Sequence, residues 1–398
     1  MDLETVMIFL CAFGLSLLAV LALTPAVRSL ARRLQFLDYP NRNKVHLNPT
    51  PLMGGIAVAL ASLASAAAAL ALINTPYSAR LVGFMSGGLM VVVLGLADDA
   101  NGMRPRSKFL GQTAAAAVML LSGGIDGIPL PAPLAFILAL FWMVGLMNAF
   151  NFLDNMDGIT AGLAAIATLG IFVLAAGHGQ TNIAIAAIAV AGGALGFLWY
   201  NFAPASIFLG DAGSLFLGYV VGGLSLRAVA YAEGGVSALL IPVLMLGYPI
   251  FDALFVTAAR YSEGRDIAQG GRDHSSHRIA SLGFTSKQTA SVIYLISGLL
   301  TAVAVYMSLF QSERPALMAL VAVAAVSGMT LLGVRLFRVP VEAAPEGAPA
   351  TLAASGTALF EPQEDDLLVL SLPRSEDAEA PSEPEPADSP SLEKIETR

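Results

Sequence analysis

The sequence predicts an all-α integral membrane protein with about eleven transmembrane helices. Hydrophobic residues make up 56% of the 398 residues, and charged residues make up 13%. Soluble domains usually carry about 25% charged residues, so this chain has too few polar side chains to cover a surface in water. The mean hydropathy of +0.72 agrees with this. Lipid must therefore contact much of the chain.

Eleven apolar segments approach the ~20 residues that a helix needs to cross a bilayer. They lie at residues 5–27, 52–73, 81–97, 109–123, 133–150, 159–177, 181–200, 213–231, 237–259, 290–310 and 315–336. The first segment follows Asp2 and Glu4, with no basic residue before it and no convincing cleavage site after it. We therefore expect a permanent span rather than a signal peptide.

The distribution of positive charge predicts the orientation in the membrane. Of the 18 Lys and Arg in residues 1–340, 15 lie in connections that follow the odd-numbered spans. Arg80, Arg227 and Arg314 are the exceptions. Cytoplasmic loops are enriched in Lys and Arg, so we expect the N-terminus outside and the C-terminus in the cytoplasm.

Two regions differ sharply in composition. Residues 1–339 form the predicted polytopic membrane domain, whereas residues 340–398 are rich in Pro, Glu, Ser and Ala. From Val341 to Arg398 there are 14 acidic and 3 basic residues. Such a composition predicts a disordered cytoplasmic tail. The single cysteine, Cys11, excludes an intrachain disulfide and a cysteine-ligated cluster.

Polar residues gather in five clusters, all on the predicted cytoplasmic side. The clusters are Asp38 to His46 with Pro51 to Gly55, Asp98 to Gly102, Asn148 to Gly158, Phe208 to Ser214, and Gly271 to Arg278. Five loops that converge on one face predict a single active site facing the cytoplasm.

The acidic residues of these clusters predict a divalent metal. Asp98, Asp99, Asp154, Asp157 and Asp211 lie at or near helix ends, and a carboxylate at membrane depth costs about 2.5–3.5 kcal/mol. An oxygen-rich site without thiolates favours Mg²⁺ or Mn²⁺. The alternative is that these acids merely mark helix ends in contact with water.

Basic residues and histidines complement the acids. His274, His277, Arg278 and Lys44 supply donors for phosphate oxygens, whereas His46 is more ambiguous. Two alternatives remain for the histidine loop: a zinc site formed by the His-x-x-His pair, or an ordinary basic cytoplasmic loop.

Two further features lie close to the clusters. Asp252 is an acid within a predicted span, which makes it either a functional group or the structural partner of an asparagine or arginine on a neighbouring helix. Gly54, Gly55, Gly210 and Gly213 permit close backbone approach, and the helix starts beside them offer N–H groups to an anion or to Asp211.

With these motifs, the chain resembles the polyprenyl-phosphate N-acetylhexosamine-1-phosphate transferases, the family that includes MraY and WecA/TagO. The resemblance covers about residues 5–336 and leaves out the acidic tail. It implies a Mg²⁺-dependent enzyme, with Mn²⁺ as an alternative, that transfers an N-acetylhexosamine-1-phosphate from a UDP-sugar to polyprenyl (undecaprenyl) phosphate and releases UMP. Such a reaction starts a lipid-linked cell-envelope glycan, as in lipopolysaccharide or teichoic acid biosynthesis.

The resemblance also implies roles for individual residues. The residues expected at the chemistry are Asp98, Asp99, Asp154, Asp157 and His274. The residues expected to bind substrate are Lys44, His46, Asn151, His277 and Arg278, and those expected to bind metal are Asp211 and Asp154. A general base is chemically optional, because a phosphate monoester with a second pKa near ~6 is already mostly a dianion at neutral pH.

The histidine segment favours the WecA/TagO branch. Members of the MraY branch carry three adjacent histidines, whereas this chain reads His274-Ser275-Ser276-His277-Arg278. UDP-GlcNAc is therefore the expected sugar donor. Phospho-MurNAc-pentapeptide transfer is the alternative, and a non-catalytic transporter is a more distant one. We expect an enzyme of the bacterial cytoplasmic membrane that has no nucleic-acid partner. A homodimer is compatible with the sequence.

Overall fold

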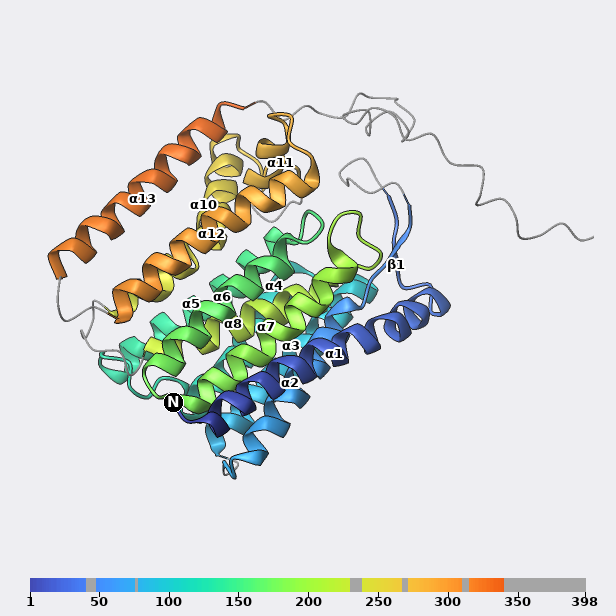
Figure 1. Cartoon of the computed structure of the whole chain (residues 1–398). Helices are drawn as coiled ribbons and strands as arrows, with labels where there is room; N and C mark the ends of the chain where they lie inside the picture. Colours follow the sequence, from blue (N-terminus) through green and yellow to red (C-terminus); the bar gives the residue numbers. More distant parts are fainter. Residues whose placement is uncertain (41–47, 76–77, 230–237, 267–270, 310–314, 340–398) are drawn as a thin grey trace, which may run out of the picture. The chain divides into compact units, whose positions relative to one another are not determined.

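The computed structural model describes residues 1–40, 48–75, 78–229, 238–266, 271–309 and 315–339 (Figure 1). Over these ranges the helices are joined by turns and loops, and the one pair of strands is a short hairpin in which β1 (Leu37–Asp38) pairs antiparallel with β2 (Thr50–Pro51). The helices are α1 (Leu3–Arg33), α2 (Gly54–Leu72), α3 (Ala79–Asn101), α4 (Pro105–Met119), the π-helical turn η1 (Leu120–Gly124), α5 (Ala132–Leu153), α6 (Ile159–Gly177), α7 (Thr181–Asn201), α8 (Gly210–Val229), α9 (Leu240–Met245), α10 (Gly247–Ser262), α11 (Ser275–Ala280), α12 (Ser286–Leu309) and α13 (Pro315–Phe337).

The prediction of an all-α protein with several membrane spans is confirmed. Among the described residues, the helices long and apolar enough to cross a membrane are α1, α2, α3, α5, α6, α7 and α12. Each of them coincides with one of the eleven predicted segments. The boundary predicted at residue 340 and the acidic tail beyond it lie outside the described residues.

Two of the other predicted segments are not single straight helices. The segment at 109–123 is divided between α4 and η1, and the segment at 237–259 is divided into α9 and α10 at Leu246. Pro249 explains the second break, because it has no N–H to donate to the carbonyl four residues earlier. Proline is tolerated in the first turn of a helix, which is where α10 contains it.

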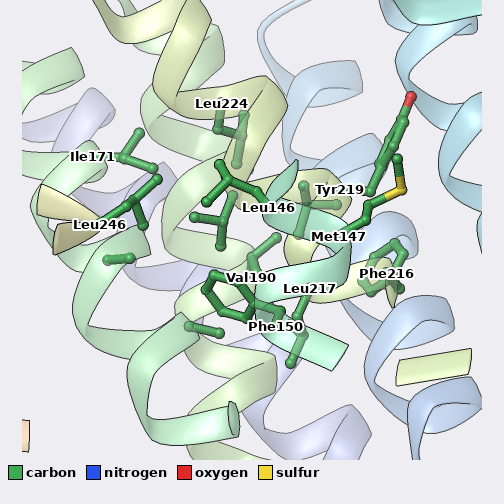
Figure 2. Packing of buried hydrophobic residues seen from close by; sticks show 14 of the residues in the cluster. Leu146, Met147, Phe150, Ile171, Val190, Phe216, Leu217, Tyr219, Leu224 and Leu246 are labelled. Carbon is green, nitrogen blue, oxygen red and sulfur yellow. The ribbon is translucent and has the colours of Figure 1, made fainter. Parts of the chain in front are cut away.

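Helix α8 lies at the centre of the packing and contacts α2, α3, α5, α6 and α7. Its side chains Phe216, Leu217 and Tyr219 are fully buried, and Figure 2 shows them beside Met147 and Phe150 of α5. In a membrane, small residues let helix backbones approach closely.

Glycines make two of these close approaches possible. A Cβ atom on Gly55 of α2 would lie 2.2 Å from the backbone nitrogen of Gly213, and one on Gly95 of α3 would lie 2.3 Å from the Cα of Ala212. The start of α8 is therefore pressed between α2 and α3, as the glycines of the sequence suggested.

Backbone hydrogen bonds tie the loop before α8 to the start of α2. The N–H groups of Gly54 and Gly55 donate to the carbonyls of Phe208 and Leu209 at 3.0 and 2.9 Å, and the Phe208 N–H donates to the Pro51 carbonyl at 2.8 Å. Because the carbonyls occupy these two N–H groups, the start of α2 does not offer them to an anion. The contacts instead place the β1–β2 hairpin next to the start of α8.

Candidate active site

Asp99 at the end of α3 caps the start of α8. Its Oδ1 atom accepts a hydrogen bond from the Asp211 N–H at 2.9 Å, and its Oδ2 atom accepts one from the Ala212 N–H at 3.2 Å. The first N–H groups of a helix have no acceptor within the helix, so Asp99 satisfies two of them from another helix. Gly210 has a φ of +70°, and a Cβ there would lie 2.6 Å from Asp99 Oδ2. The arrangement therefore fixes where Asp211 begins its helix.

Lys108 of α4 joins the acids of α3 to those of α8. Its ammonium lies 2.8 Å from Asp98 Oδ2, donates to Asn151 Oδ1 at 2.9 Å, and forms an ion pair with Asp211. Asn151 in turn donates to Asp211 Oδ1 at 2.7 Å. Side chains from α3, α5 and α8 thus converge on one cation of α4.

Sequence reasoning did not single out Lys108, which counted only as one of the cytoplasmic bases. The sequence does contain a polar residue that draws attention to Lys108, four residues later within the apolar segment that follows it. Gln112 is completely buried within a predicted apolar span, and it accepts a hydrogen bond from Asn148 at 2.7 Å. Residues three or four apart share a helix face, so Lys108 and Gln112 on α4 form a polar stripe that matches Asn148 and Asn151 on α5.

The loop between α5 and α6 contributes Asp154 and Asp157. Burial raises the pKa of Asp154 to about 8, and the negative charges of Asp211 and Asp99 act in the same direction. The Asp157 carboxylate accepts a hydrogen bond from the Ala205 N–H at 2.8 Å, which ties this loop to the segment before α8. Asp154 thus lies near the acids of α3 and α8, whereas Asp157 also holds two loops together.

The histidine loop is attached to the same region. The Ser276 hydroxyl donates to Asn155 Oδ1 at 2.7 Å, which links α11 to the loop after α5. His274 and His277 are 4% and 8% exposed, and their ring centroids lie 6.4 Å apart. Burial and the positive charges of His274 and Arg272 lower the pKa of His277 to about 4, so this ring is neutral at physiological pH.

Asp252 has a partner that sequence reasoning did not name. Its carboxylate pairs with His274 and with Ser275, rather than with an asparagine or an arginine. Asp252 therefore has a structural partner, and that partner belongs to the histidine loop that is expected to bind substrate.

Arg278 is directed to the end of the last helix. Its Nη1 atom donates to the carbonyls of Phe337 and Val339 at 3.1 and 3.0 Å, and its guanidinium lies over the rings of Phe255 and Phe337 at 5.3 and 5.6 Å. Arg278 therefore caps α13, and none of the described contacts joins its guanidinium to Asp98, Asp99, Asp154 or Asp211.

The acidic cluster supplies oxygen donors of the kind that a divalent cation prefers. In the part of the chain that the structure describes, no group of three or more His, Cys, Asp or Glu side chains is arranged as a metal site. The oxygens of Asp98, Asp211 and Asn151 nevertheless converge on the Lys108 ammonium, and Asp99 adds a further carboxylate beside them. One ammonium does not neutralise three carboxylates, and oxygen donors are the ligands that Mg²⁺ prefers.

The remaining predicted residues, Lys44 and His46, lie in 41–47, outside the described residues. The structure brings together Asp98, Asp99, Asn151, Asp154 and Asp211. It links Asp157 and His274 to that group through neighbouring loops.

Comparison with known proteins agrees with this architecture. The sequence pattern of glycosyl transferase family 4 matches residues 81–229, the stretch that contains Asp98, Asp99, Lys108, Asp154 and Asp211. All of the acids that converge in the structure thus fall within the matched region.

Similar proteins extend the match to most of the chain. A probable undecaprenyl-phosphate N-acetylglucosaminyl 1-phosphate transferase of Bacillus subtilis is 36% identical over 72% of this chain and 81% of its own length. A decaprenyl-phosphate N-acetylglucosaminephosphotransferase of Mycobacterium tuberculosis is 32% identical over 78% of this chain and 84% of its own length. A phospho-N-acetylmuramoyl-pentapeptide-transferase of Desulforudis audaxviator is 36% identical over 55% of this chain and 75% of its own length. The chain therefore belongs to glycosyl transferase family 4, the polyprenyl-phosphate N-acetylhexosamine-1-phosphate transferases.

Proposed function

We propose that this protein transfers GlcNAc-1-phosphate from UDP-GlcNAc to a polyprenyl phosphate and releases UMP. The relatives named for this reaction cover 72–78% of the chain. The observation that carries the proposal is the pairing of Lys108 with both Asp98 and Asp211, where Asp99 at the end of α3 caps the start of α8. A helix end at the bilayer boundary can receive both a lipid phosphate and a water-soluble nucleotide.

The reaction balances without a separate base. An oxygen of the lipid phosphate attacks the sugar-bearing phosphorus of UDP-GlcNAc, a new P–O bond forms, and the bond to the UMP oxygen breaks. The lipid phosphate is mostly a dianion at neutral pH, so no proton has to be removed before attack. The products are polyprenyl-diphospho-GlcNAc and UMP, and the total charge is unchanged.

The demanding part of this step is to bring two anions together. We assign Asp211 and Asp154 as ligands of Mg²⁺, which when bound would neutralise charge on the diphosphate. Lys108 keeps Asp98 and Asp211 in place and offers a positive charge to the reacting phosphates. Asp98 would act beside the lipid phosphate.

Asp99 is better suited to support than to proton transfer. Both of its oxygens accept backbone N–H groups at the start of α8, so the carboxylate holds Asp211 in position. This assignment keeps Asp99 essential to the site but gives it a different role from that of a base.

The nucleotide sugar would lie toward the loops after α5 and before α11. Asn151 and Asp157 would shape its pocket, with Lys44 and His46 contributing from the segment between β1 and β2. His274 would meet phosphate as a donor, and the neutral ring of His277 suits a sugar hydroxyl or amide better than a phosphate. Arg278 would act indirectly, through the end of α13.

The topology proposed with this function has eleven spans, an external N-terminus and an active site that faces the cytoplasm of a bacterial cell. Its support is the placement of 15 of 18 basic residues on one side. Reporter domains fused after Gly177 and after Val339 should therefore report opposite sides of the membrane. The same side for both fusions would contradict the proposed topology.

Phospho-MurNAc-pentapeptide transfer is the second candidate, and the 36% identity to a phospho-N-acetylmuramoyl-pentapeptide-transferase favours it. That match covers a smaller share of the chain than the GlcNAc-type matches do. The segment from His274 to Arg278 also lacks three adjacent histidines. None of the relatives named here supports the transporter hypothesis.

The function is tested by supplying purified protein with UDP-GlcNAc or UDP-MurNAc-pentapeptide together with undecaprenyl phosphate, and by identifying the lipid product by mass spectrometry. We expect polyprenyl-diphospho-GlcNAc. The Asp211→Asn variant should fold and yield no product, because it loses a metal-binding charge with little change in volume. Asp126→Asn is a matched control, because Asp126 pairs with Arg80 away from the site. A MurNAc product would reject UDP-GlcNAc as the donor. An active Asp211→Asn variant would reject the metal-binding role of Asp211.

A further inference from the structure

Asp252 holds the start of the histidine loop from inside the protein. The side chain is fully buried on α10. Its Oδ1 atom accepts a hydrogen bond from the Ser275 N–H at 2.8 Å, and the Ser275 hydroxyl donates to the same oxygen. Its Oδ2 atom lies 2.8 Å from Nδ1 of His274. One carboxylate therefore fixes the backbone of α11 and the ring that precedes it.

This pairing determines which ring nitrogen of His274 carries a proton. A carboxylate only accepts hydrogen bonds, so Nδ1 must be the donor. The partner of one histidine nitrogen sets the state of the other, and no contact among the described residues occupies Nε2. Aromatic packing limits the ring further, because the Phe152 ring lies edge-on to it with centroids 6.3 Å apart.

We propose that Asp252 is a positioning residue that keeps His274 protonated on Nδ1 and thereby presents Nε2 to the anionic nucleotide sugar. This inference rests on the proposed function, because it assumes that His274 meets a phosphate. With Nδ1–H bound to a carboxylate, a second proton on Nε2 produces a charged donor, and hydrogen bonds from charged donors to phosphate are the stronger kind. Asp252 itself touches no substrate.

An amide at position 252 should move the proton of the neutral His274 ring from Nδ1 to Nε2. The buried Ser275 N–H needs an acceptor, so the amide oxygen of an Asp252→Asn side chain turns toward it. The NH₂ group then faces Nδ1 of His274. Because that group only donates, the ring must accept on Nδ1 and carry its single proton on Nε2. The charged form of the ring, which carries a proton on both nitrogens, then has no acceptor for its Nδ1–H.

The test combines kinetics with the state of the ring. Release of UMP is measured for the wild type and for Asp252→Asn, His274→Ala and the double variant. We expect Asp252→Asn to lower kcat/KM for UDP-GlcNAc by about 10- to 100-fold, the effect typical of residues that orient a functional histidine. In the His274→Ala background the same change should have little further effect, because residues that act through each other are not additive.

Tyr248→Phe is the matched control. Tyr248 lies on the same helix, is fully buried and bonds the Ser275 hydroxyl at 2.8 Å, but it does not touch His274 in the described contacts. This variant disturbs the same buried network and should retain kcat/KM within about threefold of the wild type, well short of the loss expected for an orienting residue. A loss as large as that of Asp252→Asn would show that general disruption of the network is sufficient, and would overturn the proposal.

Nitrogen NMR of histidine-labelled protein provides the readout that a purely structural role would not move. Nδ1 of His274 should be protonated in the wild type and unprotonated in Asp252→Asn. An unprotonated Nδ1 in the wild type overturns the proposal even if the variant fails to fold, and so does an equal loss of activity with and without His274. Absence of UMP release by the wild type would instead reject the proposed function, and the NMR result would still test the pairing.

Discussion

Replacement of Lys108 by methionine is expected to separate metal binding from turnover. The ammonium bonds Asp98, Asn151 and Asp211, so it shares Asp211 with the proposed Mg²⁺. Methionine keeps much of the length of the side chain and removes the charge. The variant therefore lacks a cation that both repels the metal and stabilises the reacting phosphates.

Loss of this charge should strengthen Mg²⁺ binding and, at the same time, slow turnover. Two unit charges about 4 Å apart interact by ~1 kcal/mol in water-like surroundings, so an ammonium repels a neighbouring dication by about 2 kcal/mol. That energy corresponds to a factor of about 30 in affinity, so the half-saturating Mg²⁺ concentration should fall. Loss of one donor to a transition-state charge lowers kcat by about 10²- to 10³-fold, so turnover should fall at the same time.

The assay is UMP release at saturating substrates over a series of Mg²⁺ concentrations. Arg106→Met serves as the control, because Arg106 is an exposed base two residues earlier on α4. We expect the control to behave like the wild type. A Lys108→Met variant with kcat within about threefold of the wild type, or with an unchanged Mg²⁺ requirement, would refute the role given to Lys108.

Three further predictions follow from the same contacts. Asp99→Asn should lower both kcat and thermal stability, because an amide has one acceptor oxygen for the two N–H groups of α8 and leaves one unpaired at about 1–3 kcal/mol; unchanged stability would contradict the capping role. His277, whose pKa burial and neighbouring positive charge lower to about 4, should stay neutral in an NMR titration from about pH 8 to 5.5. The fold favours its neutral form, so its contribution to stability is present above its ordinary pKa of 6.5 and is lost as the pH falls from 6.5 toward 4; a midpoint near 6.5 would contradict the burial. Removal of residues 341–398 should leave UMP release intact, and loss of release from a folded truncated protein would give the tail a role in catalysis.

Residue order predicted the seven apolar helices that are long enough to cross a membrane, and it drew attention to acids that the structure places near one another. Asp98, Asp99 and Asp211 stood out because acids are unusual at the ends of apolar helices. The different roles of these three acids could not be predicted from their positions in the sequence. That Asp99 caps α8 while Asp98 pairs with Lys108 depends on how α3, α4 and α8 pack.

Other contacts could not be predicted from the sequence either, because they also depend on how the helices and loops pack. Lys108 resembled any cytoplasmic base, because its partners are brought to it by three other helices. Arg278 was expected at phosphate, but its guanidinium contacts the end of α13, 59 residues later in the chain. Asp252 was recognised as unusual, yet its partner His274 lies across a loop whose path the sequence does not specify.

The most direct test of the central claim is release of UMP by purified protein given UDP-GlcNAc, with undecaprenyl phosphate and Mg²⁺ each present and then withheld. Release that requires both the lipid phosphate and the metal is the predicted result. Release without lipid would indicate hydrolysis of the nucleotide sugar, and release unaffected by chelation would contradict the metal-dependent site at Asp211. No release from folded protein with either UDP-sugar would contradict the transferase assignment.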